Sequence, residues 1–306
     1  MRTDRRALLA LTAAGVLWGT TVPLSKLALE WLPPAWLAAI RFAIAAAALI
    51  AIAGPGRVRR ACRPGLLAAG AAGYGGSVLL QNVGITRTSV SDAALLVGAA
   101  PVLVAVIAAA WHRSVARPLA WGGFALSLAG VGLVTGLHGT GSSASGNALV
   151  LISVLISSVF TVGQSRMLEG RDPIVVTAVQ FLGAALATLP VAALTEGAPP
   201  APGRITPVLI VAALAACGTL APFTLFAYGQ TRVAAEVAGA FVNIEPVVGA
   251  VAGVTLFGNP ATTGLAVGGA AILAGIGMSS RTGRARRTRR GGGASPPAGA
   301  REPAVP

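Results

Sequence analysis

The chain has 306 residues, of which 55% are hydrophobic and only 10% are charged, and its formal net charge is +14. A soluble domain carries about a quarter charged residues, so this composition excludes a protein whose surface mostly faces water. The positive charge does not indicate a nucleic-acid-binding protein, because the basic residues stand between long apolar runs instead of clustering on a polar domain. Composition therefore predicts an integral membrane protein.

A helix that crosses the hydrocarbon core needs about 20 mostly apolar residues. The sequence predicts an all-α protein with ten such helices, near residues 7–27, 35–53, 66–86, 92–111, 119–137, 147–166, 174–194, 207–229, 237–257 and 263–280. We expect the first run to be a retained helix and not a cleaved signal peptide, because it is long and nine more spans follow. Residues 281–306 are polar and rich in Gly, Pro and Arg, which predicts a disordered basic tail.

Lysine and arginine are distributed unevenly between the two sides of the predicted bundle. With the N-terminus in the cytoplasm, 19 of the 23 Lys and Arg fall on inside segments and only Lys26, Arg87 and Arg204 on outside segments. Short cytoplasmic segments of membrane proteins carry such an excess. The sequence therefore predicts a multi-pass protein of the cell (inner or plasma) membrane with both termini in the cytoplasm.

The two halves of the chain resemble each other. A shift of 145 positions, without a gap, pairs Gly84 with Gly229, Thr86 with Thr231, Arg87 with Arg232, Pro101 with Pro246 and Gly130 with Gly275. We therefore expect two five-helix repeats, residues 7–137 and 147–280. Because five is odd, the second repeat must enter the membrane with the opposite orientation. Inverted repeats of this kind place a solute site near the middle of the bilayer, between the halves.

Several short motifs resemble those of a known family. They are Leu17-Trp18-Gly19, Ile40-Arg41-Phe42, Gly84-Ile85-Thr86-Arg87, Ala100-Pro101-Val102, Gly130-Val131-Gly132 and Asn243-Ile244-Glu245-Pro246-Val247. In this order they resemble the drug/metabolite transporter superfamily, specifically the ten-helix EamA-type exporters with two EamA repeats. The resemblance covers residues 7–280. It implies a secondary transporter, an exporter of amino acids or related small metabolites, and it implies that Trp18 faces the central cavity.

One departure from the family pattern concerns a Gly-Glu pair. Members of the family often carry this pair after the fourth and ninth spans. This chain has Trp111-His112-Arg113 and Phe257-Gly258-Asn259 at those places. It therefore does without that glutamate or uses another group.

Glu245 is the only carboxylate deep within a predicted span. Burying such a group costs about 2.5–3.5 kcal/mol on insertion scales, so it needs a reason. Pro246 lacks an N–H and frees the carbonyl of Val242, which creates a polar site beside the carboxylate. The functional interpretation is a proton-coupling site or a ligand for a substrate ammonium. The structural alternative is a bond to a neighbouring helix, with Arg41 as the candidate partner and Pro246 as a kink.

Polar residues recur at helical spacing in three spans. They are Tyr74, Ser77 and Gln81 in the third, Ser153, Ser157, Phe160 and Gln164 in the sixth, and Thr224 and Tyr228 in the eighth. Such stripes suit a polar cavity, although small hydroxyl residues also serve helix packing. We predict that the substrate contacts Trp18, Tyr74, Ser77, Gln81, Ser157, Gln164, Tyr228 and Asn243. We also expect Pro23, Pro101 and Pro246 to kink their helices.

Motifs for other chemistries are missing from the sequence. There is no GxxxxGK[ST] phosphate loop and no HExxH pair, and His112 and His138 have no nearby ligand partners, so we expect no cofactor and no metal.

The expected partners are a small-molecule substrate and the lipid bilayer, without nucleic acid, and two fused repeats favour a monomer. The alternatives are a lipophilic-cation or drug extruder and a non-transporting membrane partner protein. A membrane enzyme is disfavoured, because no cluster of catalytic residues is apparent.

Overall fold

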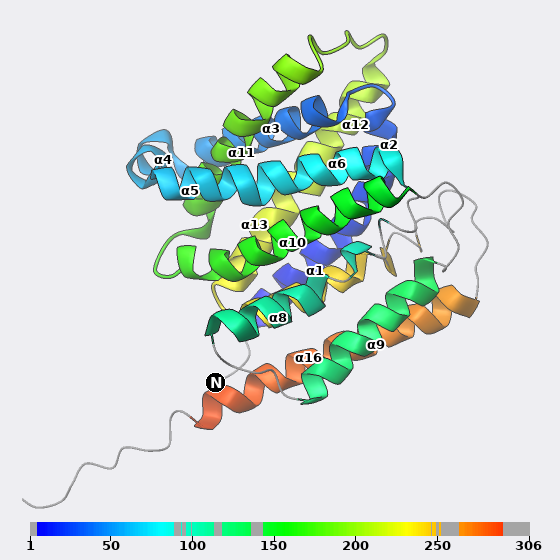
Figure 1. Cartoon of the computed structure of the whole chain (residues 1–306). Coiled ribbons are helices and arrows are strands. Elements are labelled where there is room, and N and C mark those ends of the chain that lie inside the picture. The colour runs from blue at the N-terminus through cyan, green and yellow to red at the C-terminus, as the bar shows by residue number, and fades with distance from the viewer. Residues whose placement is uncertain are drawn as a thin grey trace, which may run out of the picture.

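The fold is helical throughout the part of the chain that the computed structural model describes (Figure 1). That part comprises residues 5–88, 93, 96–98, 100–112, 118–135, 143–245, 247–248, 251 and 263–289. Pro246, Asp92 and His138 lie outside the described residues, as do positions 257–259 and 290–306.

The first half of the chain forms a series of short and long helices. They are α1 (Arg5–Gly19), α2 (Thr21–Leu29), α3 (Pro34–Ala53), α4 (Pro55–Ala61), α5 (Pro64–Gly70), the π-helical turn η1 (Ala71–Gly76), α6 (Ser77–Arg87), α8 (Ala100–His112) and α9 (Pro118–Thr135). Prolines begin α3, α4 and α5, where the missing N–H would have had no intrahelical partner. The helix α4 was not expected, because its seven residues are too few and too polar to register as a span.

The second half repeats this order. Its elements are α10 (Ala144–Met167), α11 (Pro173–Thr195), α12 (Ile205–Ala215), the π-helical turn η2 (Ala216–Leu220), α13 (Ala221–Gln230), α14 (Ala235–Ala240), the 3₁₀ turn η3 (Phe241–Asn243) and α16 (Thr263–Arg289). Side chains cap two of these helices: Ser143 accepts from the N–H of Gly146 and Asp172 from the N–H of Ile174. These caps satisfy donors that would otherwise lack partners at the helix starts.

Four helices are long and apolar enough to cross a membrane, namely Pro34–Ala53, Ala144–Met167, Pro173–Thr195 and Ile205–Gln230. Three shorter apolar helices, Ala100–Trp111, Pro118–Leu133 and Ala266–Met278, lie beside them. The outer surface exposes large apolar side chains, among them Leu194 (86% exposed) and Leu9 and Ile205 (both 68%). Such a surface suits hydrocarbon and not water, so the chain is a multi-span membrane protein.

The internal repeat is visible in the backbone. A shift of 145 positions carries η1, residues 71–76, onto residues 216–221, which contain η2, residues 216–220. π-Helical turns are rare and occur mostly as single turns inside α-helices, so two at equivalent positions are a strong sign of common architecture. The predicted relation between the halves therefore extends from sequence to local conformation.

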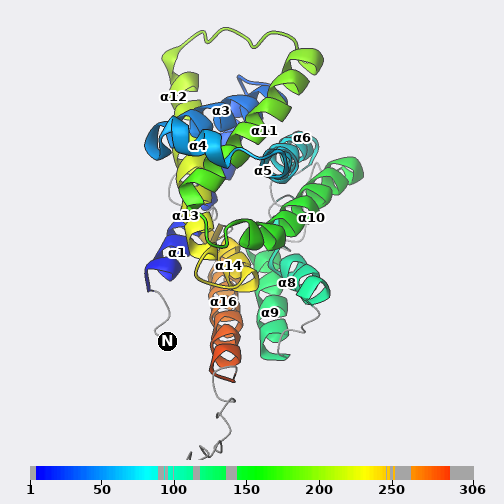
Figure 2. The ribbon, with the colours of Figure 1, turned by 90° about the vertical axis from the view of Figure 1, so that its left-hand side faces the viewer.

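The contact between α9 and α16 is symmetrical. A methyl group on Gly130 would lie 2.6 Å from the carbonyl oxygen of Gly268, and one on Gly275 would lie 2.4 Å from that of Gly123. Gly123 and Gly130 correspond to Gly268 and Gly275 under the same shift. Each helix therefore uses the same two glycines to approach the other, and the pair lies side by side in Figures 1 and 2.

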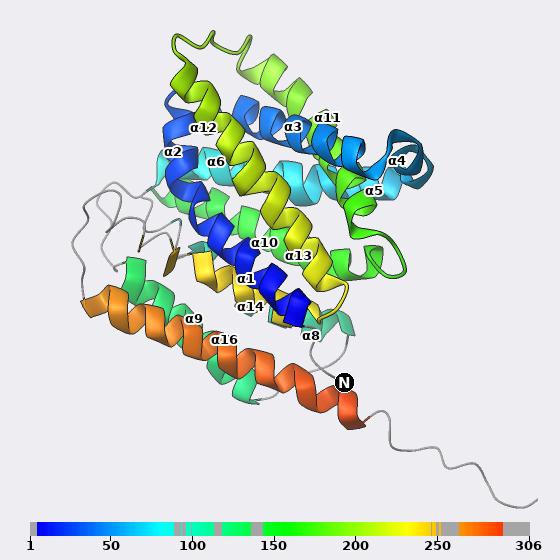
Figure 3. The same ribbon diagram turned by 180° about the vertical axis from the view of Figure 1, so that it is seen from behind.

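Equivalent helices also pack on equivalent partners. α3 packs along its counterpart α11, and α1 packs on α13 as α10 packs on α6. The start of α1, α4, the α10–α11 connection and the end of α16 lie at one end of the bundle (Figure 3). At that end Arg57 Nη2 donates to Asp172 Oδ2 at 2.7 Å. The arginine-bearing segments of both halves thus gather at the end that holds both ends of the described chain.

Three sequence expectations need correction or refinement. The first span is not continuous, because α1 ends at Gly19 and α2 starts at Thr21, ahead of Pro23. α16 continues to Arg289, so residues 281–289 of the expected tail are helical, since arginine and alanine favour helix and no proline stops it. Pro101 lies in the first turn of α8, where a proline breaks no hydrogen bond within that helix.

Candidate functional site

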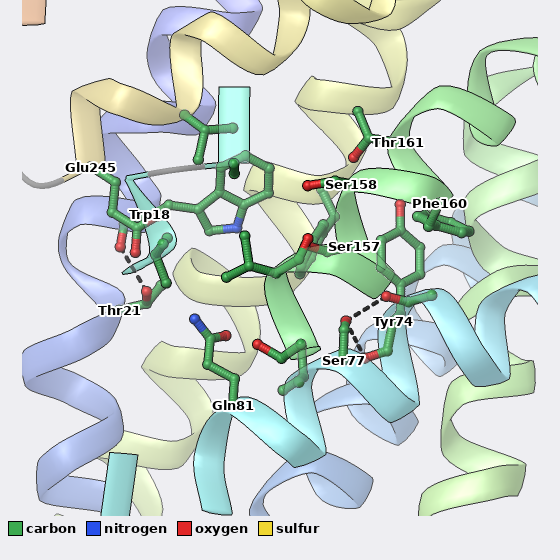
Figure 4. Close-up of a pocket in the computed structure, with 18 of the residues that line it drawn as sticks. Trp18, Thr21, Tyr74, Ser77, Gln81, Ser157, Ser158, Phe160, Thr161 and Glu245 are labelled. Atoms are coloured by element: carbon green, nitrogen blue, oxygen red, sulfur yellow. Dashed lines mark hydrogen bonds between the residues drawn. The ribbon is translucent and has the colours of Figure 1, made fainter. Parts of the chain in front are cut away.

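A cavity of about 160 Å³ lies between the two halves (Figure 4). Its polar lining comprises Trp18, Thr21, Ser25, Arg41, Tyr74, Ser77, Gln81, Asn82, Ser153, Ser157, Ser158, Thr161, Gln164 and Glu245. Six of the predicted substrate-contacting residues are in this set: Trp18, Tyr74, Ser77, Gln81, Ser157 and Gln164. The cavity also includes the predicted coupling residue Glu245. The structure therefore brings side chains from distant parts of the sequence into one place.

Aromatic rings form one wall of the cavity. Tyr74 lies 4.6 Å from Phe160 and 4.7 Å from Phe223, measured between ring centroids. Trp18 lies 5.0 Å from Phe223 and 5.2 Å from Phe226. Offset and edge-on ring pairs at these distances are mutually stabilising and rigid. The wall therefore offers a fixed apolar surface to the uncharged part of a solute.

The π-helical turn η1 places Tyr74 against the sixth span. Gln164 Nε2 donates to Tyr74 Oη at 2.6 Å and to Gln180 Oε1 at 3.1 Å. All three side chains are buried, so each hydrogen bond is protected from water. This network joins η1, α10 and α11, and it fixes the orientation of the Tyr74 hydroxyl at the cavity wall.

The equivalent turn η2 holds a buried arginine. Arg41 Nε donates to Thr219 Oγ1 at 2.9 Å, and Arg41 Nη2 donates to the carbonyl of Gly218 at 3.2 Å. Arg41 is only 5% exposed, so it does not extend to water at the membrane surface. Its recorded partners are Thr219 and Gly218, whereas the sequence suggested Glu245. Each repeat thus uses its π-helical turn to engage a polar side chain from another helix.

Glu245 lies on the opposite wall from η1, beside Trp18 and Thr21 (Figure 4). A methyl group on Gly19 would lie 2.8 Å from the backbone oxygen of Glu245 and 2.4 Å from Val248 Cβ. Only glycine lets α1 approach this segment so closely. Within the described part of the chain, the carboxylate of Glu245 has no recorded hydrogen bond or ion pair, and Arg41 is the other charged residue on the cavity wall.

Several hydroxyl groups bond to backbone carbonyls three or four residues earlier in the chain. Ser77 donates to the carbonyl of Gly73, Ser157 to that of Val154 and Thr21 to that of Trp18. Their oxygen lone pairs remain as acceptors at the cavity. The buried hydroxyl of Ser158 has no partner within the described residues, and Gln81 points into the cavity in Figure 4. Together these groups can hydrogen-bond a small polar solute.

Other predicted residues lie elsewhere. Tyr228 is not part of the cavity lining, and the Arg232 guanidinium lies 3.7 Å from the centre of its ring. Asn243 belongs to η3, but its side chain is outside the described part of the structure, as is all of Pro246. Sequence reasoning missed Thr21, Ser158 and Phe223 as lining residues. Thr21 lies one helical turn after Trp18, which is a signal that could have found it.

Metal binding has no support in the described residues. No group of three or more His, Cys, Asp or Glu there could hold an ion. Both cysteines, Cys62 and Cys217, are exposed and unpaired by a disulfide. The cavity lining supplies hydroxyl, amide, aromatic, guanidinium and carboxylate groups.

Two helical repeats around a central polar cavity define a membrane transporter of small molecules as the class of protein. The sequence matches the EamA-like transporter family over residues 5–136 and 144–281, and the chain belongs to that family. The family is a non-enzyme class. A solved structure titled only as a crystal structure of a protein is 23% identical, covers 91% of this chain and 97% of its own, and superposes with a TM-score of 0.77. That likeness shows the shared fold. The search of curated proteins found no match.

Proposed function

We propose that this protein is a secondary transporter that exports amino acids or related small metabolites by alternating access. The observation that carries the proposal is the cavity itself, enclosed between two inverted repeats and lined by hydroxyl, amide and aromatic groups. We place the arginine-bearing end of the bundle in the cytoplasm, in the cell membrane, following the positive-inside rule. Because the two repeats complete the cavity, we propose that one chain is the working unit.

The conformation supports alternating access, because the cavity is closed at its arginine-bearing end. A methyl group on Gly229 in α13 would lie 2.6 Å from Cδ2 of Leu11 in α1. Gln230 Nε2 donates to the carbonyl of Thr161 at 3.0 Å across the same end. Towards the other end, the lining continues to Asn82 and Ile85 near the end of α6. We therefore propose that a solute enters this conformation from the side away from the arginines.

The two halves differ in conformation at this contact. The counterpart of Gly229 is Gly84, and the counterpart of Leu11 is Ile156. A methyl group on Gly84 would meet Cγ2 of Val150 at 2.6 Å, and Ile156 is not among the atoms nearest to it. Repeats with the same fold and different contacts are what a two-state transporter requires. In the opposite state, we propose that Gly84 packs on Ile156 and the outer end closes.

Glu245 is the proposed proton-coupling residue. It is a carboxylate on the cavity wall without a recorded partner in the described part of the chain, so a proton or a substrate ammonium is free to bind it. If the two compete for this one group, proton entry drives substrate exit. The charged residue that shares the cavity wall with it is Arg41.

The test is transport by the purified chain in liposomes with an imposed pH gradient, measured with labelled neutral amino acids. The wild type should move substrate against its gradient when protons flow the other way. The variant Glu245→Gln should lose this gradient-driven accumulation, because its side chain can neither exchange a proton nor carry the charge that binds the substrate ammonium. Accumulation by Glu245→Gln equal to the wild type would remove Glu245 from the coupling mechanism.

A second candidate function is the extrusion of lipophilic cations. The aromatic wall around Trp18, Tyr74 and Phe223 favours it, because aromatic faces attract organic cations. Arg41 on the same cavity disfavours it by like-charge repulsion. Transport of tetraphenylphosphonium in the same liposomes, in preference to any amino acid, would support the extruder over the amino-acid transporter.

A further inference from the structure

We propose that Arg41 binds the carboxylate of the transported solute while Glu245 binds its positively charged group, so that the cavity selects zwitterions. This inference rests on the proposed transport function and assigns the parts of the substrate to residues. The sequence suggested Arg41 only as a structural charge partner or as a residue that reaches the membrane surface.

The first observation is the unused hydrogen-bonding capacity of Arg41. A guanidinium has five N–H donors and no acceptor. The recorded bonds use two of them, one to Thr219 Oγ1 and one to the carbonyl of Gly218, and the structure gives the other three no partner among the described residues. Arg41 is 5% exposed yet belongs to the cavity lining, so a molecule in the cavity is the partner within reach. Donors left unpaired inside a membrane protein are costly.

The second observation is that Arg41 is held in a fixed orientation. The wide turn η2 presents the Thr219 hydroxyl and the Gly218 carbonyl to the guanidinium from the same side. Gly218 lets Thr21 pack closely on this turn, since a methyl group there would lie only 2.7 Å from Thr21 Cγ2, while Arg41 Nη2 at 3.6 Å would be in ordinary contact. When one edge of a guanidinium is fixed in this way, the N–H groups of its other edge can donate two parallel hydrogen bonds to the two oxygens of a carboxylate.

The third observation is the placement of the opposite charge. Thr21 contacts the Gly218 position that Arg41 bonds, and Glu245 lies beside Thr21 in Figure 4. The two charged groups therefore flank the same residue without a recorded ion pair between them. A solute with one positive and one negative group balances both. A simple anion or a simple cation would leave one charge uncompensated in a low-dielectric site, which is unfavourable.

The aromatic wall completes the arrangement. Trp18 and Phe223 extend from the same region and face the cavity. They can cover the uncharged side chain of a neutral amino acid while its two charged groups meet Arg41 and Glu245. The cavity thus offers a separate contact for the carboxylate, the ammonium group and the uncharged side chain of one solute.

The test measures binding to the purified full-length chain by isothermal titration calorimetry. The probes are L-leucine, L-phenylalanine and L-glutamine, each compared with its amide, which keeps the ammonium and lacks the carboxylate. The wild type should bind at least one amino acid about tenfold or more tightly than its amide, the effect expected for a charge-assisted hydrogen-bonded pair. The ratio of the two affinities within one variant does not depend on how much of the sample is folded.

Three variants separate substrate binding from structural support. Arg41→Gln should bring the ratio near one while the amide still binds, and Arg41→Lys should retain part of the preference. Thr188→Val is the matched control, since it removes a buried hydroxyl that donates to the carbonyl of Ala184 within α11 and is not part of the cavity lining, so the preference should persist. If Arg41→Gln does not fold, the ratio of amino-acid affinity to amide affinity in the wild type and in Arg41→Lys still tests whether Arg41 binds the carboxylate.

Two results would overturn the inference in different ways. Equal binding of an amino acid and its amide by the wild type, or a preference that survives Arg41→Gln, would remove Arg41 from substrate recognition and leave the transport function standing. If no amino acid binds the folded wild type, the proposed substrate class fails as well, and this assignment fails with it.

Discussion

Leu11 of α1 packs directly on the backbone of Gly229 in α13, so closely that a methyl group on Gly229 would lie 2.6 Å from Leu11 Cδ2. Gly229 is not among the glycines with a positive φ. Glycine is therefore needed there because of the limited space and not because of its conformational freedom. Phe226 and Ile244 lie in the same apolar cluster as Leu11. In the proposed alternating-access cycle, a conformational change would have to break this tightly fitted apolar contact.

The variant Gly229→Ala should destabilise this closed conformation. Inserting a methyl group into a packed contact costs about 1–3 kcal/mol. Gly163→Ala is the matched control, because the nearest atom to a methyl there is the flexible end of Met167 at 3.8 Å. We expect the melting temperature in detergent to fall below that of the wild type for Gly229→Ala and to stay unchanged for Gly163→Ala. Equal melting temperatures would contradict a tight contact at Gly229.

Alternating access predicts which cysteine pairs form cross-links in each state. With Cys62 and Cys217 replaced by serine, Leu11→Cys with Gly229→Cys should cross-link readily in the described conformation. Gly84→Cys with Ile156→Cys should cross-link only after conditions favour the opposite state, such as substrate on the other side of the membrane. Cross-linking is read by a mobility shift after cleavage between the repeats. Both pairs forming together, independent of substrate, would argue against two exclusive states.

The amino-acid sequence predicts the spans and the inverted repeat because hydrophobicity and a fixed shift of 145 positions are both local patterns. It also finds most of one cavity face, since Tyr74, Ser77 and Gln81 recur with the helical period. It misplaces Tyr228, because periodicity tells which residues share a face and not which face meets the cavity. The π-helical turns and the bonding of Arg41 to η2 depend on contacts between distant helices, so no local pattern signals them.

The two tyrosines of the chain offer a matched pair of substitutions. Tyr74→Phe removes the oxygen that accepts from Gln164 Nε2, which should lower stability by about 1 kcal/mol and weaken solute binding. Tyr228→Phe changes a ring that is not part of the cavity lining, so binding should be unchanged. Titration of the same amino acid into both variants checks this. Stronger loss with Tyr228→Phe would reverse the assignment of the two residues.

Stability at acidic pH should depend on Asp172, which lies outside the spans. Partial burial alone would raise its pKa, but hydrogen bonds from Arg57 and from the N–H of Ile174 prevail and hold the pKa below its ordinary value of 3.8. A carboxyl whose pKa is lowered by folding stabilises the protein above the pKa of the unfolded chain. That stabilisation is lost as the pH falls below about 4 and through the lower folded pKa.

The matched variant is Asp172→Asn, which keeps a helix-capping side chain and removes the charge. Both side chains of the ion pair are substantially exposed, at 53% for Arg57 and 36% for Asp172, so the effect should be small, about 0–1 kcal/mol. Melting temperatures between pH 3 and pH 6 should decline more steeply for the wild type than for Asp172→Asn. Parallel curves would show that the Arg57–Asp172 pair does not stabilise the fold.

The most direct test of the transport account is counterflow with purified protein in liposomes. Vesicles are loaded with an unlabelled neutral amino acid and diluted into a trace of the same labelled compound, without any ion gradient. A transporter with a single alternating cavity predicts transient accumulation of label above equilibrium in the wild type and none in protein-free vesicles. Folded protein that gives no accumulation with any compound of an amino-acid and small-metabolite panel would contradict the claim that this cavity carries such solutes across the membrane.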